Sequence, residues 1–307
     1  MTDRRTWVFI GVTFLISWGT FAMGKWASGP GAPGVPATMF FMLGPAAAAL
    51  LLRRRMGLKW HDLGIVRRGI NWKWMAASIL IAAVLPLLTL FFNWLFGEVM
   101  NWAVFGHTAL SKDMLLSNVE QRMAQSNLDA DRIESSLARL SSIPFNGAAL
   151  MIAFSFIGAL AGGIINLPFT LGEELGWRGM LLHFTRHKGL WPHVLFTGIV
   201  WGLWHAPLIL EGHNYPEHRW AGVFFMCLLT VGLALPMVWV RVRGGCIWAA
   251  GVLHGAVNGT AGTTLLFTRG GSDLAGGAVG ISALCGLAVI GSLLFLIDPD
   301  FRRSFIQ

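Results

Sequence analysis

Charged side chains are scarce in this sequence. They make up 12% of the 307 residues, against about a quarter in soluble globular domains. Apolar residues make up 55%, and the mean hydropathy is +0.61. The polar side chains are too few to cover a water-soluble globule of this size. The composition therefore excludes a soluble or disordered chain and predicts a membrane protein.

Cysteine is also scarce, and its pattern excludes two further classes of protein. Cys227, Cys246 and Cys285 stand singly in apolar segments, without the spacing of a disulfide scaffold or a cysteine zinc site. Positive charge is in excess, with a net charge of +8 and a pI near 10.3. The basic residues gather at the ends of apolar runs, as in membrane proteins, so we expect no nucleic-acid partner.

The apolar runs predict an all-α, polytopic membrane protein with about eight transmembrane helices. A helix needs about 20 residues to cross a bilayer. Runs of about this length occupy residues 6–26, 36–52, 72–97, 147–170, 191–210, 219–241, 246–267 and 277–297. They divide the chain into N-terminal transmembrane helices (1–97), a polar insert (98–146) and C-terminal transmembrane helices (147–307).

The insert 98–146 is the one long stretch that lacks membrane-like hydropathy. Apolar residues recur in it at helical spacing, first at Met114, Leu115 and Val119 and then at Ile133 and Leu137. This spacing predicts two short amphipathic helices. We place them on the extracytoplasmic side.

The distribution of Lys and Arg predicts the orientation of the chain. With eight spans and a cytoplasmic N-terminus, 16 of the 23 Lys and Arg residues lie on the cytoplasmic side, for example in the turns 53–59 and 186–188. Cytoplasmic loops of membrane proteins carry such an excess. We therefore expect an integral, multi-pass protein with both termini in the cytoplasm. In a prokaryote its membrane would be the cytoplasmic membrane.

Ionisable residues inside apolar segments mark functional sites by default. Glu173 and His205 lie 16 residues to either side of residue 189, so an antiparallel helical hairpin would place them at the same depth. His254 follows the next cytoplasmic turn, and Asn258 lies one helical turn further along on the same face. These separate segments are expected to converge.

The segment that carries Glu173 combines a helix breaker with an ion pair. Pro168 should break the helix just before Glu173, and a broken helix at membrane depth is tolerated where it lines a cavity. We expect this cavity to open toward the cytoplasm. Glu174 and Arg178 are spaced i, i+4, which favours an ion pair with a structural, supporting role.

The converging groups suit the attack of water on an amide. Glu173, left without a partner, could act as a general base, and His205 could hold the water with it. His254 and Asn258 could stabilise the oxyanion. Three tryptophans near these residues are expected to line a lipid or peptide groove, namely Trp177, Trp201 and Trp204.

Three motifs in this order resemble the signatures of the CPBP (CAAX protease and bacteriocin-processing) family, which includes the type II prenyl-protein endopeptidases. They are Glu173-Glu174-x-x-x-Arg178, Trp201-x-x-x-His205 and His254-x-x-x-Asn258. The second motif usually begins with Phe, and here an aromatic residue is kept. The resemblance covers roughly residues 145–265.

The resemblance implies an eight-helix intramembrane endopeptidase of the glutamate type, with its site reached from the cytoplasmic side. Glu173 and His205 would activate the water, and His254 and Asn258 would stabilise the oxyanion. Its substrate would be a prenylated or otherwise membrane-associated peptide or protein in the lipid bilayer. We expect no cofactor. Zinc, held by Glu173, His205 and His254, is the alternative, although the sequence lacks a His-Glu-x-x-His helix.

Two other classes of function stay open at this point. A transporter or channel could use Glu173 and the histidines as proton or ion sites, although no inverted repeat is evident. A non-catalytic immunity or scaffold protein could keep the same motifs and act by binding. The serine and aspartyl signatures Gly-x-Ser-Gly and Gly-x-Gly-Asp do not occur in the sequence.

Overall fold

Helices form most of the protein in a computed structural model, which describes residues 3–28, 40–66, 70–125, 129–142, 144 and 146–305. Arg67 and Arg68, which belong to an expected cytoplasmic turn, lie outside the described residues. The described strands are β1 (His107–Thr108) and β2 (Thr268–Arg269), which pair with each other in antiparallel fashion.

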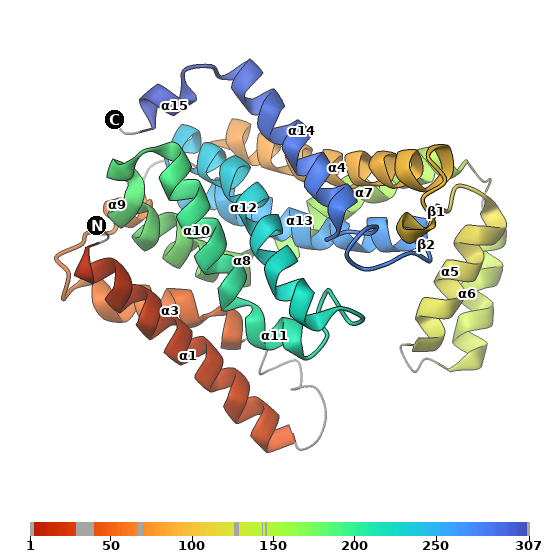
Figure 1. The fold of residues 1–307 in the computed structure, drawn as a ribbon, viewed down its shortest axis with the longest axis horizontal. Coiled ribbons are helices and arrows are strands. Elements are labelled where there is room, and N and C mark those ends of the chain that lie inside the picture. The colour runs from red at the N-terminus through yellow and green to blue at the C-terminus, as the bar shows by residue number, and fades with distance from the viewer. Residues whose placement is uncertain are drawn as a thin grey trace.

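Each of the eight apolar runs contains a helix of the bundle in Figure 1. These helices are α1 (Arg4–Ser28), α3 (Gly44–Arg53), α4 (Trp72–Trp94), α7 (Gly147–Ile165), α10 (Leu190–Trp204), α12 (Arg219–Gly244), α13 (Ile247–Phe267) and α14 (Ile281–Ile297). Among the described residues, four helical segments are long and apolar enough to cross a membrane: Arg4–Ser28, Trp72–Val99, Gly147–Ile165 and Arg219–Gly244. The predicted fold class, an all-α polytopic membrane protein, is confirmed.

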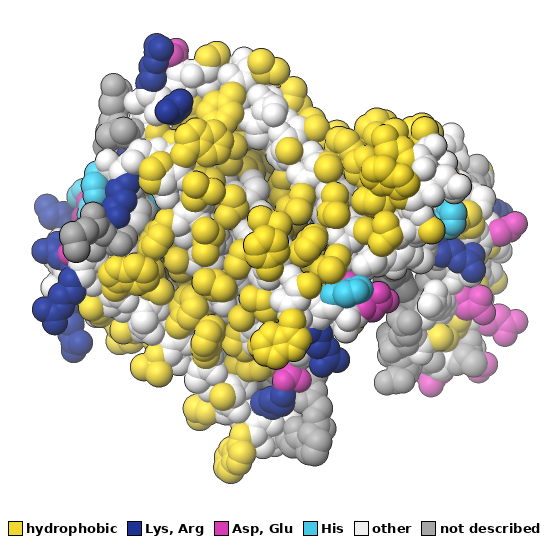
Figure 2. Space-filling model, viewed as in Figure 1, with side chains coloured by type: hydrophobic (Ala, Val, Ile, Leu, Met, Phe, Trp, Pro, Cys, Tyr) yellow, Lys and Arg dark blue, Asp and Glu magenta, His cyan; other side chains and the backbone are white. Residues whose placement is uncertain are grey.

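The two ends of the bundle differ in charge. Figure 1 places both chain termini and α9 (Leu182–Thr185) at the same end. Figure 2 shows Lys and Arg side chains gathered along this edge, while hydrophobic side chains cover the middle of the molecule. The basic turns at 186–188 and 241–243 lie at this end, because they border α10 and α12 where those helices leave the bundle. We call it the basic end.

The insert forms a helical hairpin at the opposite end, as its apolar spacing predicts. It consists of α5 (Lys112–Gln125) and α6 (Ala130–Ser142), which pack on each other. The β1–β2 pair, which the sequence analysis did not predict, ties the start of the insert to the end of α13. The Asn118 side chain adds to this link by donating a hydrogen bond to the Leu266 carbonyl at 2.9 Å.

Glycine allows the motif-bearing helices to approach closely. On α7, a Cβ added to Gly162 would lie 2.5 Å from the backbone oxygen of Gly255 on α13. A Cβ on Gly198 of α10 would lie 2.5 Å from the Val231 Cα on α12. The small-residue pairs of the sequence therefore mark close helix contacts, as is common in membrane bundles. They bring α13 against the segment that carries Glu173.

We predict that Gly162→Ala destabilises the protein by about 1–3 kcal/mol, because the new methyl group overpacks the α7–α13 contact. Gly262→Ala is the matched control, since Gly262 is also helical and nothing lies within 4 Å of its added Cβ. Thermal unfolding in detergent measures both variants. Equal shifts of the two midpoints would contradict the close contact.

Candidate functional site

A break between α7 and α8 directs Glu173 and Glu174 into the protein interior. α7 ends at Ile165, and α8 (Leu167–Glu174) begins after the single residue Asn166, with Pro168 in its first turn. Proline costs no hydrogen bond there, because the first N–H groups of a helix have no partner within it. The Asn166 amide nitrogen donates to the Gly255 carbonyl at 3.1 Å and so holds the break against α13. A break is thus present in this segment, as predicted, but it lies at Asn166, two residues before Pro168.

The chain then widens into a π-helical turn (Leu175–Leu181) directly after Glu174. Such wide turns inside α-helices are frequent at functional sites. Glu173 and Glu174 are the last residues of α8, and they are 2% and 0% exposed to solvent. Two neighbouring carboxylates are therefore buried together, and each needs polar partners of its own.

Glu174 is held by a buried ion-pair cluster. Its Oε1 accepts a hydrogen bond from Arg178 Nη1 at 3.0 Å, which confirms the predicted i, i+4 pair. The same oxygen lies 3.0 Å from His254 Nδ1, a contact that the sequence analysis did not predict. Arg178 also lies over the Trp201 ring, 4.4 Å from its centre. A carboxylate only accepts hydrogen bonds, so Nδ1 of His254 carries the proton and Nε2 is left for another partner.

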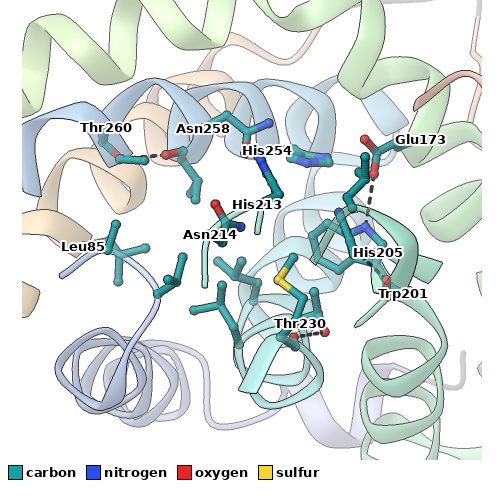
Figure 3. Close-up of a pocket in the computed structure, with 18 of the residues that line it drawn as sticks. Leu85, Glu173, Trp201, His205, His213, Asn214, Thr230, His254, Asn258 and Thr260 are labelled. Atoms are coloured by element: carbon teal, nitrogen blue, oxygen red, sulfur yellow. Dashed lines mark hydrogen bonds between the residues drawn. The ribbon is translucent and has the colours of Figure 1, made fainter. Parts of the chain in front are cut away.

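Glu173 has a different environment from Glu174. Its Oε2 accepts a hydrogen bond from Trp201 Nε1 at 3.1 Å, and Glu173 lines the internal cavity whereas Glu174 does not (Figure 3). No ion pair holds Glu173 among the described residues. The two neighbouring acids therefore differ as the sequence predicts: Glu174 is bound to a cation, and Glu173 faces the cavity.

His205 is oriented by the last turn of α10. Its Nδ1 lies 2.8 Å from the Trp201 carbonyl, and because a carbonyl only accepts, Nδ1 is the protonated nitrogen. Nε2 then carries the free lone pair. The ring packs against Trp204, with 4.7 Å between the ring centres. Trp201 thus touches both predicted members of the water-activating pair, Glu173 through its indole and His205 through its backbone.

A cavity of about 500 Å³ collects these groups. All four predicted catalytic residues line it, namely Glu173, His205, His254 and Asn258 (Figure 3). Trp201 and Trp204 line it too, as expected for a groove. Trp177 does not, because it is fully buried behind Trp204, with 5.7 Å between the ring centres.

Apolar side chains form much of the remaining wall. α4 contributes Leu85 and Pro86, and α12 contributes Met226, Leu229 and Leu233. All five are buried in the bundle. The cavity thus places polar groups on one side and an aliphatic surface on the other.

The cavity reaches the surface at the end of the bundle away from the basic turns. His213 and Asn214, on the loop after α11 (Ala206–Leu210), line it and are exposed. Ala278 and Val279, just before α14, complete this rim. These four residues carry no signal in the sequence, because loop positions show no periodicity. The two expectations of cytoplasmic basic turns and a cavity open to the cytoplasm are therefore incompatible.

The arrangement does not fit a zinc ion held by Glu173, His205 and His254. Three potential metal ligands whose ligand atoms lie within 4.8 Å of one another occur elsewhere in the described part of the chain, at the surface: Glu217, His218 and Asp273. Glu173, His205 and His254 do not form such a group there. Atoms bound to one zinc ion lie within about 4.4 Å of each other, given bonds of about 2.0–2.2 Å.

The fold and the site together define a polytopic, all-α membrane protein with a polar site inside its helical bundle. Residues 142–260 match the family described as Type II CAAX prenyl endopeptidase Rce1-like. This range contains Glu173, His205, His254 and Asn258. The resemblance predicted from the three motifs is confirmed for this segment, which is similar to the Rce1-like family.

A curated relative points in the same direction. The "CAAX prenyl protease 2" of Methanococcus maripaludis is 30% identical over 134 residues, which are 40% of this chain and 49% of the relative. The chain thus matches about half the length of this relative.

We predict that Arg178→Met destabilises the protein by about 3–5 kcal/mol, because it leaves the buried Glu174 carboxylate without its cation. Arg303→Met is the control, since Arg303 is 88% exposed and its pair with Asp300 spans 3.9 Å. That pair should contribute nothing measurable. Thermal unfolding in detergent compares the two variants, and a mild effect of Arg178→Met would show that the cluster is dispensable.

Proposed function

We propose that the protein is an intramembrane endopeptidase that hydrolyses a peptide bond of a membrane-associated substrate. The observation that carries this proposal is the placement of a carboxylate and an imidazole, Glu173 and His205, on one cavity wall through their shared contacts with Trp201. The similarity to a CAAX prenyl protease supports it.

In the proposed reaction, a water molecule lies between the Glu173 carboxylate and Nε2 of His205. Glu173 takes a proton from the water while the water oxygen bonds to the substrate carbonyl carbon. The carbonyl oxygen becomes an oxyanion. Glu173 then gives the proton to the amide nitrogen, the C–N bond breaks, and an amine and a carboxylic acid leave.

His254 and Asn258 are proposed to stabilise the oxyanion from α13. Their i, i+4 spacing puts both side chains on the cavity face of this helix (Figure 3). An oxyanion needs donors, and Nε2 of His254 can donate only if the ring carries a second proton. The bond between Nδ1 and the Glu174 carboxylate holds the His254 ring in place. Glu174 is therefore proposed to support catalysis by orienting His254.

The substrate is proposed to combine an apolar part with a peptide part. The aliphatic wall formed by α4 and α12 can take a lipid chain or apolar side chains. The relative's name points to prenylated peptides, in which a cysteine near the C-terminus carries an isoprenoid. The protein is an integral membrane protein, and we propose from the charge distribution that both termini are cytoplasmic.

We predict that Glu173→Gln and His205→Asn each lower the rate of peptide cleavage by at least ~10²-fold, the scale of a lost general base. The assay uses purified protein and two quenched fluorescent peptides of one sequence. One carries a farnesylated cysteine three residues from its C-terminus, and the other is unmodified.

Glu120→Gln, an exposed change on α5, is the matched control and should leave the rate unchanged. Full cleavage by both site variants, with folding intact, would exclude the proposed mechanism. Flux of ions across proteoliposomes that depends on Glu173, without any cleavage, would replace it with transport.

We also propose that the reaction needs no metal. Exhaustive treatment with a chelator should then leave cleavage of the same peptides unchanged, because Glu173 and His205 activate the water themselves. Activity that is lost on chelation and restored by zinc would contradict this and favour a zinc-bound water.

A further inference from the structure

Two arginines at the basic end have no acidic partner. Arg186 lies in the turn 186–188 before α10, and Arg241 lies in the last turn of α12. In the described part of the chain neither arginine forms an ion pair. Both side chains are half-buried, and arginines that are withdrawn from water are usually paired. These two charges therefore lack a counter-ion among the described residues.

Other arginines near this end have carboxylates of their own. Arg178 is bound to Glu174, and Arg243 donates to the two oxygens of Asp298 at 2.6 and 2.7 Å. Both carboxylates are thus occupied, and neither is left to neutralise the two unpaired arginines.

Each unpaired arginine is held through its Nε atom. Arg241 Nε donates to the Arg178 carbonyl at 3.1 Å, and Arg186 Nε donates to the Phe305 carbonyl. A Cβ added to Gly64 would lie 2.2 Å from Arg241 Nη2, so the glycine makes room for this guanidinium. The terminal Nη groups of both arginines form no hydrogen bond with the described residues, and they are not sealed from solvent. Each guanidinium is therefore fixed at one end and free to bind at the other.

The two arginines lie near each other, close enough for their charges to repel. The bond to the Arg178 carbonyl places Arg241 beside the π-helical turn, and Arg186 follows α9, which continues that turn. Arginine is well suited to phosphate, because its planar fork of N–H donors matches the phosphate oxygens. A phosphate between the free Nη groups would remove the repulsion and supply the missing counter-ion.

The surroundings of these arginines are typical of the level of lipid headgroups. Trp191, in the first turn of α10, is 41% exposed and packs on Phe295 with 5.5 Å between the ring centres. Tryptophan is enriched at the interface between a membrane and water. Figure 2 shows the basic edge directly bordering the hydrophobic middle of the molecule. Basic pockets between transmembrane helices bind the headgroups of anionic lipids.

We propose that Arg186 and Arg241 bind one phosphate group, carried by an anionic lipid headgroup or free in solution. The site is separate from the cavity, which neither arginine lines, and it does not depend on the proposed endopeptidase function. It lies one hydrogen bond away from Arg178, whose side chain holds Glu174. A bound phosphate therefore stabilises the π-helical turn as well as the two arginines.

Thermal unfolding of the purified full chain in detergent tests this site. The added probes are phosphatidylglycerol, phosphatidylcholine and inorganic phosphate, all at one ionic strength. Arg186→Gln and Arg241→Gln remove the two charges, and glutamine at 241 can still donate to the Arg178 carbonyl. Arg302→Gln is the matched control, because Arg302, on α15 (Phe301–Ser304), is an exposed arginine of the same end. If Arg241→Gln does not fold, Arg186→Gln decides alone.

We expect phosphatidylglycerol to raise the unfolding midpoint of the wild type and of Arg302→Gln by about 5 °C, the scale of a ligand in large excess over its Kd. Arg186→Gln and Arg241→Gln should lose most of this shift, and phosphatidylcholine should give none. The same pattern with inorganic phosphate alone would support the site and assign free phosphate as its ligand. Equal shifts in all four proteins, equal shifts with the two lipids, or no shift of the wild type with any probe would overturn the site.

Discussion

The buried cluster of Glu174, Arg178 and His254 is the constraint on which the site depends. A charge inside a lipid-embedded bundle is costly unless it is paired and hydrogen-bonded. One carboxylate oxygen meets both Arg178 and His254 at 3.0 Å, so the cluster fixes the π-helical turn against α13. Because Glu174 takes the cation, its neighbour Glu173 is left to face the cavity with only an indole N–H as partner. The same pairing orients His254. Structure and proposed chemistry thus share one set of contacts.

Backbone proximity makes this cluster possible. The contact between Glu174 on α8 and His254 on α13 forms where the helix backbones pack closely. The glycines of α7 and α13 remove the side chains that would keep them apart, and the break at Asn166 lets the chain turn inward before Glu173. In a bilayer, a break is tolerated only where other groups satisfy the freed backbone positions. The Asn166 side chain meets this need by donating to the Gly255 carbonyl. The helix is therefore irregular only around Asn166, where a side-chain hydrogen bond compensates for the interruption.

Much of this architecture could be predicted from the sequence because it follows from spacing. Hydropathy located the eight helix-bearing runs, and the i, i+4 rule placed Glu174 with Arg178. The equal offsets of Glu173 and His205 from residue 189 placed both at the cavity. Contacts that leave no periodic pattern in the sequence could not be predicted. The bond from His254 to Glu174 depends on the rotation of α13, which spacing does not define. The rim residues His213 and Asn214 lie on a loop whose path is set by the burial of Tyr215. Trp177 was expected in the groove, but bulk and apolarity alone do not distinguish a lining residue from one behind it.

The orientation of the cavity shows how two separate constraints combine. The excess of Lys and Arg governs which end of the bundle stays in the cytoplasm and is independent of where the cavity lies. The buried residues 175–182 close the cavity at the basic end, and this closure does not depend on charge. A cavity that was open at the basic end would need the π-helical turn to part from its neighbours, which would expose Arg178 and separate Glu174 from His254 on α13. That rearrangement would dismantle the cluster that orients His254. The contacts that build the site therefore also close the cavity at the basic end.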